Sequence, residues 1–343
     1  MRAAVLGLGA TGARAARQLQ SWPSVESLML HDTSAFRVQQ AVGSLGEGCR
    51  GTDDPEEATR DCDVVLLCFP GDPVPAARQA LGRGAHVVSV STTTSAASGL
   101  LELEKVAERA RRHVVIGAGF SPGLSELVVS HVAGRFDRLD AIDLAVAGSG
   151  GLACRQERLA GTVTAGSSKL GGVSLGNLPL AGLVKSLVPN QAGVLRWFPE
   201  PLGQLRCEQA SGAEELLLGA VGPDSPSVAL HQHHSIGERV LSLLPAPLSS
   251  RKPEADLGGF AVELRGRVGE ALEVALAGAV DRPAVAAGTV AAVAAGWAVE
   301  GRLGGRWSGG LGTKVAEPTI FLAELARRGV KVAEFRPGTH ETI

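Results

Sequence analysis

The chain opens with a short apolar run that leads directly into three closely spaced glycines. The first six residues precede Gly7-x-Gly9-x-x-Gly12, and a helix-forming stretch, 13–19, follows. In such a strand–turn–helix unit the first glycine permits the tight turn, the second lets a pyrophosphate approach the backbone, and the third lets the helix pack on the sheet. The helix then directs its N-terminal amides at the phosphates. Because 45 of the 343 residues are glycine, this motif needs support from its context.

An acidic residue at the expected distance supplies that support. The apolar run Ser27–His31 ends at Asp32, twenty residues after Gly12, where a carboxylate is expected to bind the ribose hydroxyls of a dinucleotide. Asp32 would repel a 2′-phosphate and so favours NAD, whereas Arg37 could serve NADP. The predicted cofactor is therefore NAD or NADP, and the balance favours NAD.

Composition excludes several classes of protein. A formal net charge of −2 gives no electrostatic footprint for nucleic acid or anionic lipid, so neither is expected as a partner. No secretory signal or membrane span is expected, and residues 283–299 read as a buried core helix. The five cysteines form no CxxC pair, which argues against a disulfide framework or a zinc finger and fits a cytoplasmic protein. The chain has no tyrosine, so a tyrosine general acid is excluded.

The first third of the chain alternates strands with helices, the pattern of a doubly wound parallel sheet. Its predicted strands after residue 60 are continuous apolar runs at 63–69, 86–90 and 113–116, which indicates burial on both faces. Ligands bind outside the carboxyl ends of such strands. The predicted cofactor-binding residues are therefore Gly7, Gly9, Ala10, Thr11, Gly12, Asp32, Thr33, Phe69, Pro70, Ser91, Thr92, Gly119 and Phe120.

After about residue 125 the pattern changes to that of a second, α+β domain with a mainly antiparallel sheet. A helix at 124–133 connects the two parts, and a long helix begins at Pro283. The tail, a helix at 318–328 and a strand at 330–335, is expected to pack on the nucleotide domain. We thus expect a dinucleotide-binding domain at 1–123, completed by about 283–343, and a substrate and dimerisation domain at 124–282. The predicted strands of the second domain are 139–147, 161–165, 194–198, 214–220, 227–233 and a hairpin of 260–268 with 271–278 about Gly269-Glu270.

Several motifs resemble those of the saccharopine dehydrogenase-like family, which includes saccharopine reductases and lysine 6-dehydrogenase-type enzymes. The motifs are the opening glycine turn, the strand 63–70, the turn Gly117-x-Gly-Phe-x-Pro-Gly-Leu124, the segment 278–282 with its Ala/Val helix, and the terminal helix 321–329. The resemblance implies an NAD(P)-dependent oxidoreductase that acts at a carbon–nitrogen bond of an amino acid or its imine. It also implies a homodimer formed through the second domain. Where the family often has Asp before Pro-Gly in the turn, this chain has Ser121.

The candidates for proton transfer lie in the second domain. If 227–233 is a strand, His231 and His233 share one face, and with Lys169 they are the predicted catalytic residues. No metal site is predicted, because a third ligand at suitable spacing is absent. Arg155 is a further candidate to bind a substrate carboxylate, as are the backbone amides of the turn that begins at Ser121.

Together these features predict hydride transfer between a nicotinamide and an amine- or imine-bearing carbon of a small amino-acid-derived substrate. Two alternatives remain open. One is a sugar or aldehyde oxidoreductase of the same two-domain plan, although the stretch 89–94 lacks the Lys-Pro-type motif expected of such a protein. The other is a cofactor-binding sensor or pseudoenzyme that has lost its chemistry.

Overall fold

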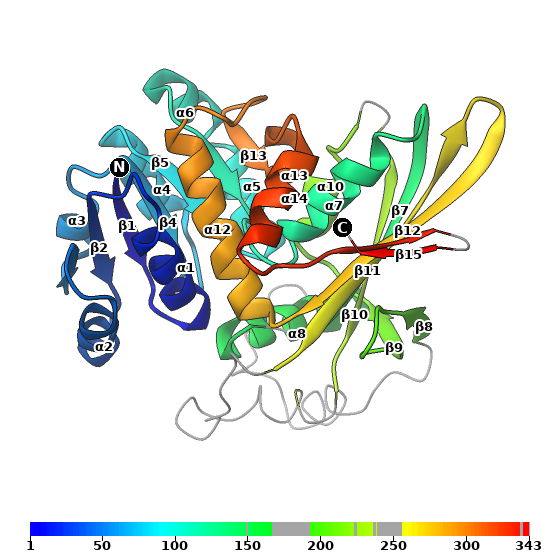
Figure 1. Cartoon of the computed structure of the whole chain (residues 1–343), viewed down its shortest axis with the longest axis horizontal. Coiled ribbons are helices and arrows are strands. Elements are labelled where there is room, and N and C mark those ends of the chain that lie inside the picture. Colours follow the sequence, from blue (N-terminus) through cyan, green and yellow to red (C-terminus); the bar gives the residue numbers. More distant parts are fainter. Residues whose placement is uncertain are drawn as a thin grey trace.

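The structure of the protein is a computed structural model, which describes residues 1–148, 150–166, 193–222, 225–235, 238, 256–336 and 339–342. It contains one sheet of seven strands and another of eight. In Figure 1 the seven-stranded sheet lies among helices, and the long strands of the eight-stranded sheet extend away from them. This architecture confirms the expected fold class, a Rossmann-type parallel sheet with a second, α+β part.

The seven-stranded sheet is parallel throughout, in the order β13-β6-β5-β4-β1-β2-β3. The chain runs outward from β1 to β3 on one side and then from β4 outward on the other, so the strand order reverses between β1 and β4. In an open α/β sheet this reversal marks the place where ligands bind. The strands are β1 (Arg2–Leu6), β2 (Ser27–His31), β3 (Cys49–Thr52), β4 (Val64–Leu67), β5 (His86–Ser89), β6 (Val114–Ile116) and β13 (Ser308–Gly310).

Helices cover both faces of this sheet, because alternate residues of its strands belong to two hydrophobic cores. In β1, Ala3 and Val5 pack in the core that includes α1 (Ala10–Gln20) and α12 (Pro283–Val299). Ala4 and Leu6 pack in the other core, with α4 (Val74–Gly82), α5 (Thr94–Leu101) and α6 (Glu104–Ala110). Fifteen residues of α12, from Pro283 to Ala298, are buried, which confirms the prediction of a core helix. Other helices of the chain are α2 (Ala35–Leu45), α7 (Leu124–Ala133), α8 (Leu152–Gly166), α10 (Ala213–Leu218), α13 (Leu311–Lys314) and α14 (Pro318–Arg327).

The eight-stranded sheet has the order β15-β14-β12-β11-β7-β10-β9-β8, and its neighbouring strands are antiparallel except for β7 and β10. Its longest pair is the predicted hairpin: Val268 pairs with Ala271 across a two-residue turn, and Gly269 adopts the positive φ of 59° that such a turn requires. The strands are β7 (Arg138–Ala147), β8 (Val194–Trp197), β9 (Gln204–Gln209), β10 (Ser227–His233), β11 (Gly258–Val268), β12 (Ala271–Asp281), β14 (Ala333–Arg336) and β15 (Thr339–Thr342).

One face of the eight-stranded sheet packs toward the nucleotide-binding part. Phe260 of β11, Val146 of β7 and Gln232 of β10 lie side by side in the register, so they share a face. The ring of Phe260 meets that of Phe120, which follows β6, edge-on at 5.2 Å between centroids. Because side chains alternate along a strand, the neighbours of these residues face the opposite side. We call the Phe260 side the inner face and the opposite side the outer face.

Three expectations for the second half need correction. Residues 161–165 belong to helix α8, and most of 214–220 belongs to helix α10, not to strands. Residues 214–218 are Glu and Leu, which favour helix. Residues 161–165, Gly-Thr-Val-Thr-Ala, have the β-branched residues typical of a strand, but they continue the helix that begins at Leu152, so their local preference is overridden. The third concerns the tail: β14 pairs with β12 and β15 with β14, so the terminal strand extends the second sheet and not the nucleotide domain. Only β13 joins the first sheet from this part of the chain, beside β6.

Within the described ranges, no helix is both long and apolar enough to cross a membrane.

Candidate functional site

The glycine turn lies at the carboxyl end of β1, beside the point where the strand order reverses. A Cβ atom at Gly7 would lie 2.6 Å from the carbonyl oxygen of Cys68, and one at Gly12 would lie 1.8 Å from that of Gly7. These two glycines are therefore required by the packing of the chain itself. A Cβ at Gly9, by contrast, would meet no atom within 4 Å. The space beside Gly9 is open, as a backbone that receives a pyrophosphate requires.

Helix α1 begins at this open space. Gly9 is its N-cap, has no side chain that could cap the helix, and accepts the first helical hydrogen bond, from the Ala13 amide at 2.9 Å. The amides of Ala10, Thr11 and Gly12 belong to the first turn, whose donors have no partner within a helix. The predicted phosphate-binding amides are thus together at one helix N-terminus, where the helix dipole favours an anion.

Asp32 follows β2 and lies next to the same turn. Its Oδ2 accepts a hydrogen bond from the Leu8 amide at 2.6 Å, and its Oδ1 accepts one from the Ser34 amide at 2.9 Å. The carboxylate is 7% exposed. Arg37 approaches Oδ2 at 3.7 Å from a largely exposed side chain, and Thr33 is exposed. The structure therefore brings together both of the residues on which the choice between NAD and NADP was predicted to depend.

The carboxyl ends of β4, β5 and β6 carry the other predicted cofactor-binding residues. Phe69 packs against the apolar core behind β4, whereas Pro70 is exposed. The Ser91 hydroxyl lies 2.9 Å from the Ser89 hydroxyl at the end of β5. After β6, Gly119 begins a tight turn that is closed by the hydrogen bond from the Leu124 amide to the Gly119 carbonyl, at 3.0 Å.

This turn requires Gly123. Gly123 has a φ of 114°, and a Cβ there would lie 2.4 Å from the Gly119 nitrogen. The turn directs Phe120 onto Phe260 and so joins the edge of the first sheet to the inner face of the second. Gly119 and Phe120 thus lie where the two parts of the molecule meet.

Helix α8 brings to this edge two charged residues that we did not predict. The Thr92 hydroxyl donates a hydrogen bond to Glu157 Oε2 at 2.9 Å. The next residue, Arg158, donates to the backbone carbonyl of Ser121 and approaches Glu214 Oε1 at 3.2 Å. The charged run 155–158 gave no sequence signal beyond that of an ordinary exposed helix, because its partners are 37 to 65 residues away in the chain.

Arg158, Glu214 and Ser121 form a buried polar cluster. Glu214 is 1% exposed, and its Oε1 also accepts a hydrogen bond from the Ser121 hydroxyl at 3.0 Å. Burial lowers the pKa of Arg158, but the Glu214 carboxylate and Cys154 together outweigh burial and raise it. Arg158 and Glu214 thus form an ion pair in which opposite charges lie together in a buried place. Glu214 thus supplies a carboxylate next to Ser121 in the turn.

Arg155 lies one turn earlier on α8. It is 3% exposed, and the nearest carboxylate oxygen, Asp256 Oδ2, is 3.9 Å from its Nη1. Among the described residues, its buried Nε has no hydrogen-bond partner. The predicted carboxylate-binding role of Arg155 remains a prediction.

The predicted catalytic histidines lie on the other side of the second sheet. His231 and His233 do share a face of β10, but the residue between them, Gln232, is the one on the inner face with Phe260. His231 Nδ1 lies 3.1 Å from Asp143 Oδ1, and His233 Nδ1 lies 2.8 Å from the carbonyl of Arg206. Strand alternation thus places the two imidazoles on the outer face, opposite Phe260, and their catalytic role stays a prediction. Lys169, the third predicted catalytic residue, lies outside the described residues.

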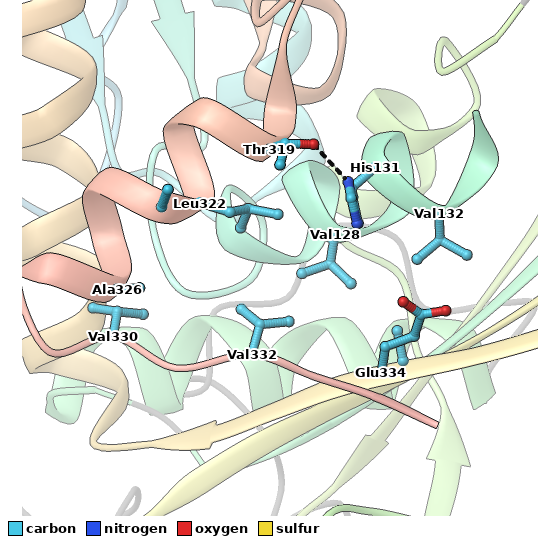
Figure 2. A pocket seen from close by; sticks show the side chains of 11 residues that line it. Val128, His131, Val132, Thr319, Leu322, Ala326, Val330, Val332 and Glu334 are labelled. Carbon is cyan, nitrogen blue, oxygen red and sulfur yellow. Dashed lines mark hydrogen bonds between the residues drawn. The ribbon is translucent and has the colours of Figure 1, made fainter. Parts of the chain in front are cut away.

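A cavity of about 220 Å³ lies between α7, α14, β12 and β14, and none of its lining residues is among those of the carboxyl edge (Figure 2). Its walls are mostly aliphatic, with Val128, Leu322 and Val332 among them. His131 Nδ1 at its rim lies 3.1 Å from the Thr319 hydroxyl, and Glu334 pairs with Arg135. The polar groups of this cavity are therefore satisfied within the chain. Elsewhere, too, the described residues contain no group of three His, Cys, Asp or Glu side chains placed to hold a metal ion.

No protein-family model matches the chain. Over 67 residues it is 39% identical to cyclohexadienyl dehydrogenase of Zymomonas mobilis, a match that covers 20% of this chain and 22% of that enzyme. The chain thus matches about a fifth of the length of this curated relative.

Two of the solved structures similar to this one align with nearly the whole chain. Apo saccharopine dehydrogenase (L-Glu forming) from Saccharomyces cerevisiae has a TM-score of 0.65 at 12% identity, and the alignment covers 98% of this chain and 100% of that one. An engineered D-amino acid dehydrogenase bound to NADP⁺ has a TM-score of 0.51 at 15% identity over 96% of this chain and 99% of that one. The resemblance to saccharopine dehydrogenase that the sequence motifs indicated is therefore confirmed in the fold of the whole chain.

Proposed function

We propose that the protein is an NAD(P)-dependent oxidoreductase that transfers a hydride to or from a carbon–nitrogen centre of a small amino-acid-derived molecule. The observation that carries this proposal is the contrast among the three glycines of the first turn. The fold accounts for Gly7 and Gly12 but leaves open space beside Gly9. A dinucleotide whose pyrophosphate occupies that space gives the absence of a side chain at Gly9 a physical reason.

The residues at the carboxyl edge fit a dinucleotide from end to end. The first-turn amides of α1 would hold the pyrophosphate, and Asp32 would accept hydrogen bonds from the adenosine ribose. Ser91, Thr92 and Gly119, at the ends of the strands on the far side of β4, would flank the nicotinamide. When bound, the nicotinamide supplies the chemistry of accepting or donating a hydride. The protein would bind and orient the cofactor and the substrate, and it would exclude water.

The substrate class rests on fold likeness to proteins whose names specify amino acids, namely saccharopine dehydrogenase and a D-amino acid dehydrogenase. It is also supported by the charged side chains that α8 adds at the same edge. Arg155 suits a carboxylate and Glu157 suits a cationic amine, the two groups that every amino acid carries. We propose the division at residues 123/124 and 282/283, except that the terminal strands β14 and β15 belong to the second sheet.

The test compares two substitutions at sterically open glycines. Gly9→Asp would place a carboxylate where the pyrophosphate binds, and we expect at least a hundredfold loss of affinity for NAD(H) and NADP(H) by calorimetry. Gly43→Asp is the matched control, since Gly43 of α2 is exposed and also meets nothing within 4 Å. Unchanged affinity in a folded Gly9→Asp protein, or a wild type that binds neither cofactor, would refute the proposal. Turnover of sugars or aldehydes but not of amines, imines and opines would move the substrate class to the rival oxidoreductase.

We also propose that the protein is a homodimer and cytoplasmic. The outer face of the second sheet carries an apolar row along β12, where Leu272, Val274 and Leu276 are 75%, 60% and 44% exposed. Such a row favours a partner surface. All five cysteines are free thiols, which fits a reducing compartment. Light scattering of wild type and Val274→Glu would test the dimer, which this charge should dissociate.

A further inference from the structure

Glu157, which the proposed function places near the substrate amine without giving it a part in the reaction, lies where the reacting groups would meet. It belongs to α8, yet its Oε2 accepts the hydrogen bond of the Thr92 hydroxyl beyond the carboxyl end of β5. The side chain is partly buried and makes no ion pair within the described residues. Its Oε1 has no hydrogen-bond partner there either, so one carboxylate oxygen is held and the other is open.

The supports of Glu157 are fixed on both sides. The residue after it, Arg158, is buried and donates hydrogen bonds to the Ser121 carbonyl and to Glu214. The backbone of Thr92 is held by α10, because the Ala213 amide donates a hydrogen bond to the Thr92 carbonyl at 2.9 Å. Helices α8 and α10 thus clamp the end of β5 together, and the Glu157 carboxylate cannot turn away without breaking the bond from Thr92.

The other charged groups near this edge are offset or distant. Arg158 and Glu214 neutralise each other, and Asp32 belongs to the opposite side of β1. The imidazoles of His231 and His233 face outward. Arg155, two residues earlier on α8, lies 3.9 Å from Asp256. Glu157 is therefore a carboxylate without an ion-pair partner among the described residues, at the end of the site that would hold the nicotinamide and the substrate.

We propose that Glu157 binds the cationic amino group of the substrate and accepts its proton, with Thr92 as the positioning residue. This inference rests on the proposed function. During oxidation of an amine, the C–H bond breaks and its electron pair leaves as hydride for the cofactor, while the C=N bond forms. One N–H proton passes to Glu157 Oε1, so a protonated amine becomes a protonated imine. Reduction of an imine runs through the same transfers in reverse.

The first test needs no substrate. The oxidised nicotinamide carries a positive charge that the reduced form lacks, so a nearby carboxylate favours the oxidised form. Glu157→Gln should therefore weaken binding of NAD⁺ or NADP⁺ relative to the reduced cofactor, by about fivefold to tenfold. Glutamine keeps an acceptor for Thr92, so a residue with a merely structural role would leave this ratio unchanged. Glu108→Gln, which removes the same charge from an exposed position on α6, is the control.

The second test is the pH profile of turnover with whichever amine the wild type oxidises. Glu157→Gln should lower kcat/KM by about 10²–10⁴ and remove the acid limb of the profile, and Thr92→Val should shift that limb while keeping it. A wild-type cofactor ratio and profile in a folded Glu157→Gln protein would overturn the inference and leave the proposed function standing. A wild type that binds no nicotinamide cofactor would overturn both.

Discussion

The two sheets of this protein build their parts of the site in different ways. The parallel sheet presents backbone: the turn at Gly7, the amides of α1 and the turn at Gly119 all follow strands directly in the chain. The eight-stranded part presents side chains, Glu157, Arg158 and Glu214, on helices whose partners lie far away in sequence. Local geometry is enough to build the first kind of site, whereas the second depends on how the two parts pack.

The two parts of the molecule are also stabilised in different ways. In the first part, glycines prevent backbone clashes, and the strands are buried on both faces. In the second, a buried ion pair joins α8 to α10 and to the turn after β6. Five experiments, taken from the largest expected effect to the smallest, test this contrast between backbone packing and side-chain pairing.

Breaking the buried pair should have the largest effect. Arg158→Met leaves the Glu214 carboxylate buried without its cation and should lower the free energy of unfolding by about 3–5 kcal/mol. Adding Glu214→Leu should recover much of this loss, which chemical denaturation would measure. The pair of exposed Arg327 with half-buried Glu324 on α14 is the control, where Arg327→Met should cost under about 0.5 kcal/mol. Equal losses at the two pairs would contradict a clamp at α8.

In the parallel sheet the comparable weak point is a glycine. Gly12→Ala places a methyl group 1.8 Å from the Gly7 carbonyl oxygen, and we expect a loss of about 2–3 kcal/mol. Gly43→Ala, in the open space of α2, should instead raise stability by up to about 1 kcal/mol, as expected for this change within a helix. Thermal melts of both variants show whether a loss of stability in Gly12→Ala comes from the clash or from replacing a glycine in general.

Glu126 of α7 makes stability depend on pH at the junction of the two parts. It is fully buried, and burial raises its pKa to about 8, while the Gly312 amide opposes the shift. A raised pKa in the folded state means that its contribution to stability is complete below about pH 4.5 and is lost as pH rises toward 8. Glu126→Gln should therefore be more stable than wild type at pH 8–9, with a smaller difference at pH 5. A difference that does not vary with pH would show that the side chain is charged in the folded protein.

The cofactor preference is the next effect in size. Asp32→Ala removes the carboxylate that would bind the ribose, so the affinity ratio of NADP(H) to NAD(H) should rise by about tenfold, or about 1.4 kcal/mol. Arg37→Ala should move the ratio the other way. Titration of each variant with the four cofactor forms measures both shifts. If the wild type already prefers NADP(H), Arg37 dominates and the expected preference for NAD is wrong.

The smallest effect is expected on the outer face. His231→Ala and His233→Ala should leave cofactor affinity within about twofold of wild type, because their strand turns them away from Phe120 and the carboxyl edge. Gln232→Ala, which alters the inner face one residue away, is the control for His231→Ala. Loss of cofactor affinity or turnover in the histidine variants, with Gln232→Ala unaffected, would return the histidines to the site.

The sequence by itself determined the parts that depend on local backbone geometry. The strand–turn–helix at Gly7, the acid at Asp32, the parallel sheet, the core helix at Pro283 and the hairpin at Gly269 are each encoded by neighbouring residues. Only the tertiary structure decided which distant side chains join them. Strand alternation predicts that His231 and His233 share a face, but it does not predict which face of the strand another part of the molecule covers. A charged helical segment such as 155–158 gives no sign of its partners. Glu157 and Glu214 reach the site because packing brings together segments 65 and 93 residues away from Thr92 and Ser121, a contact that no local pattern encodes.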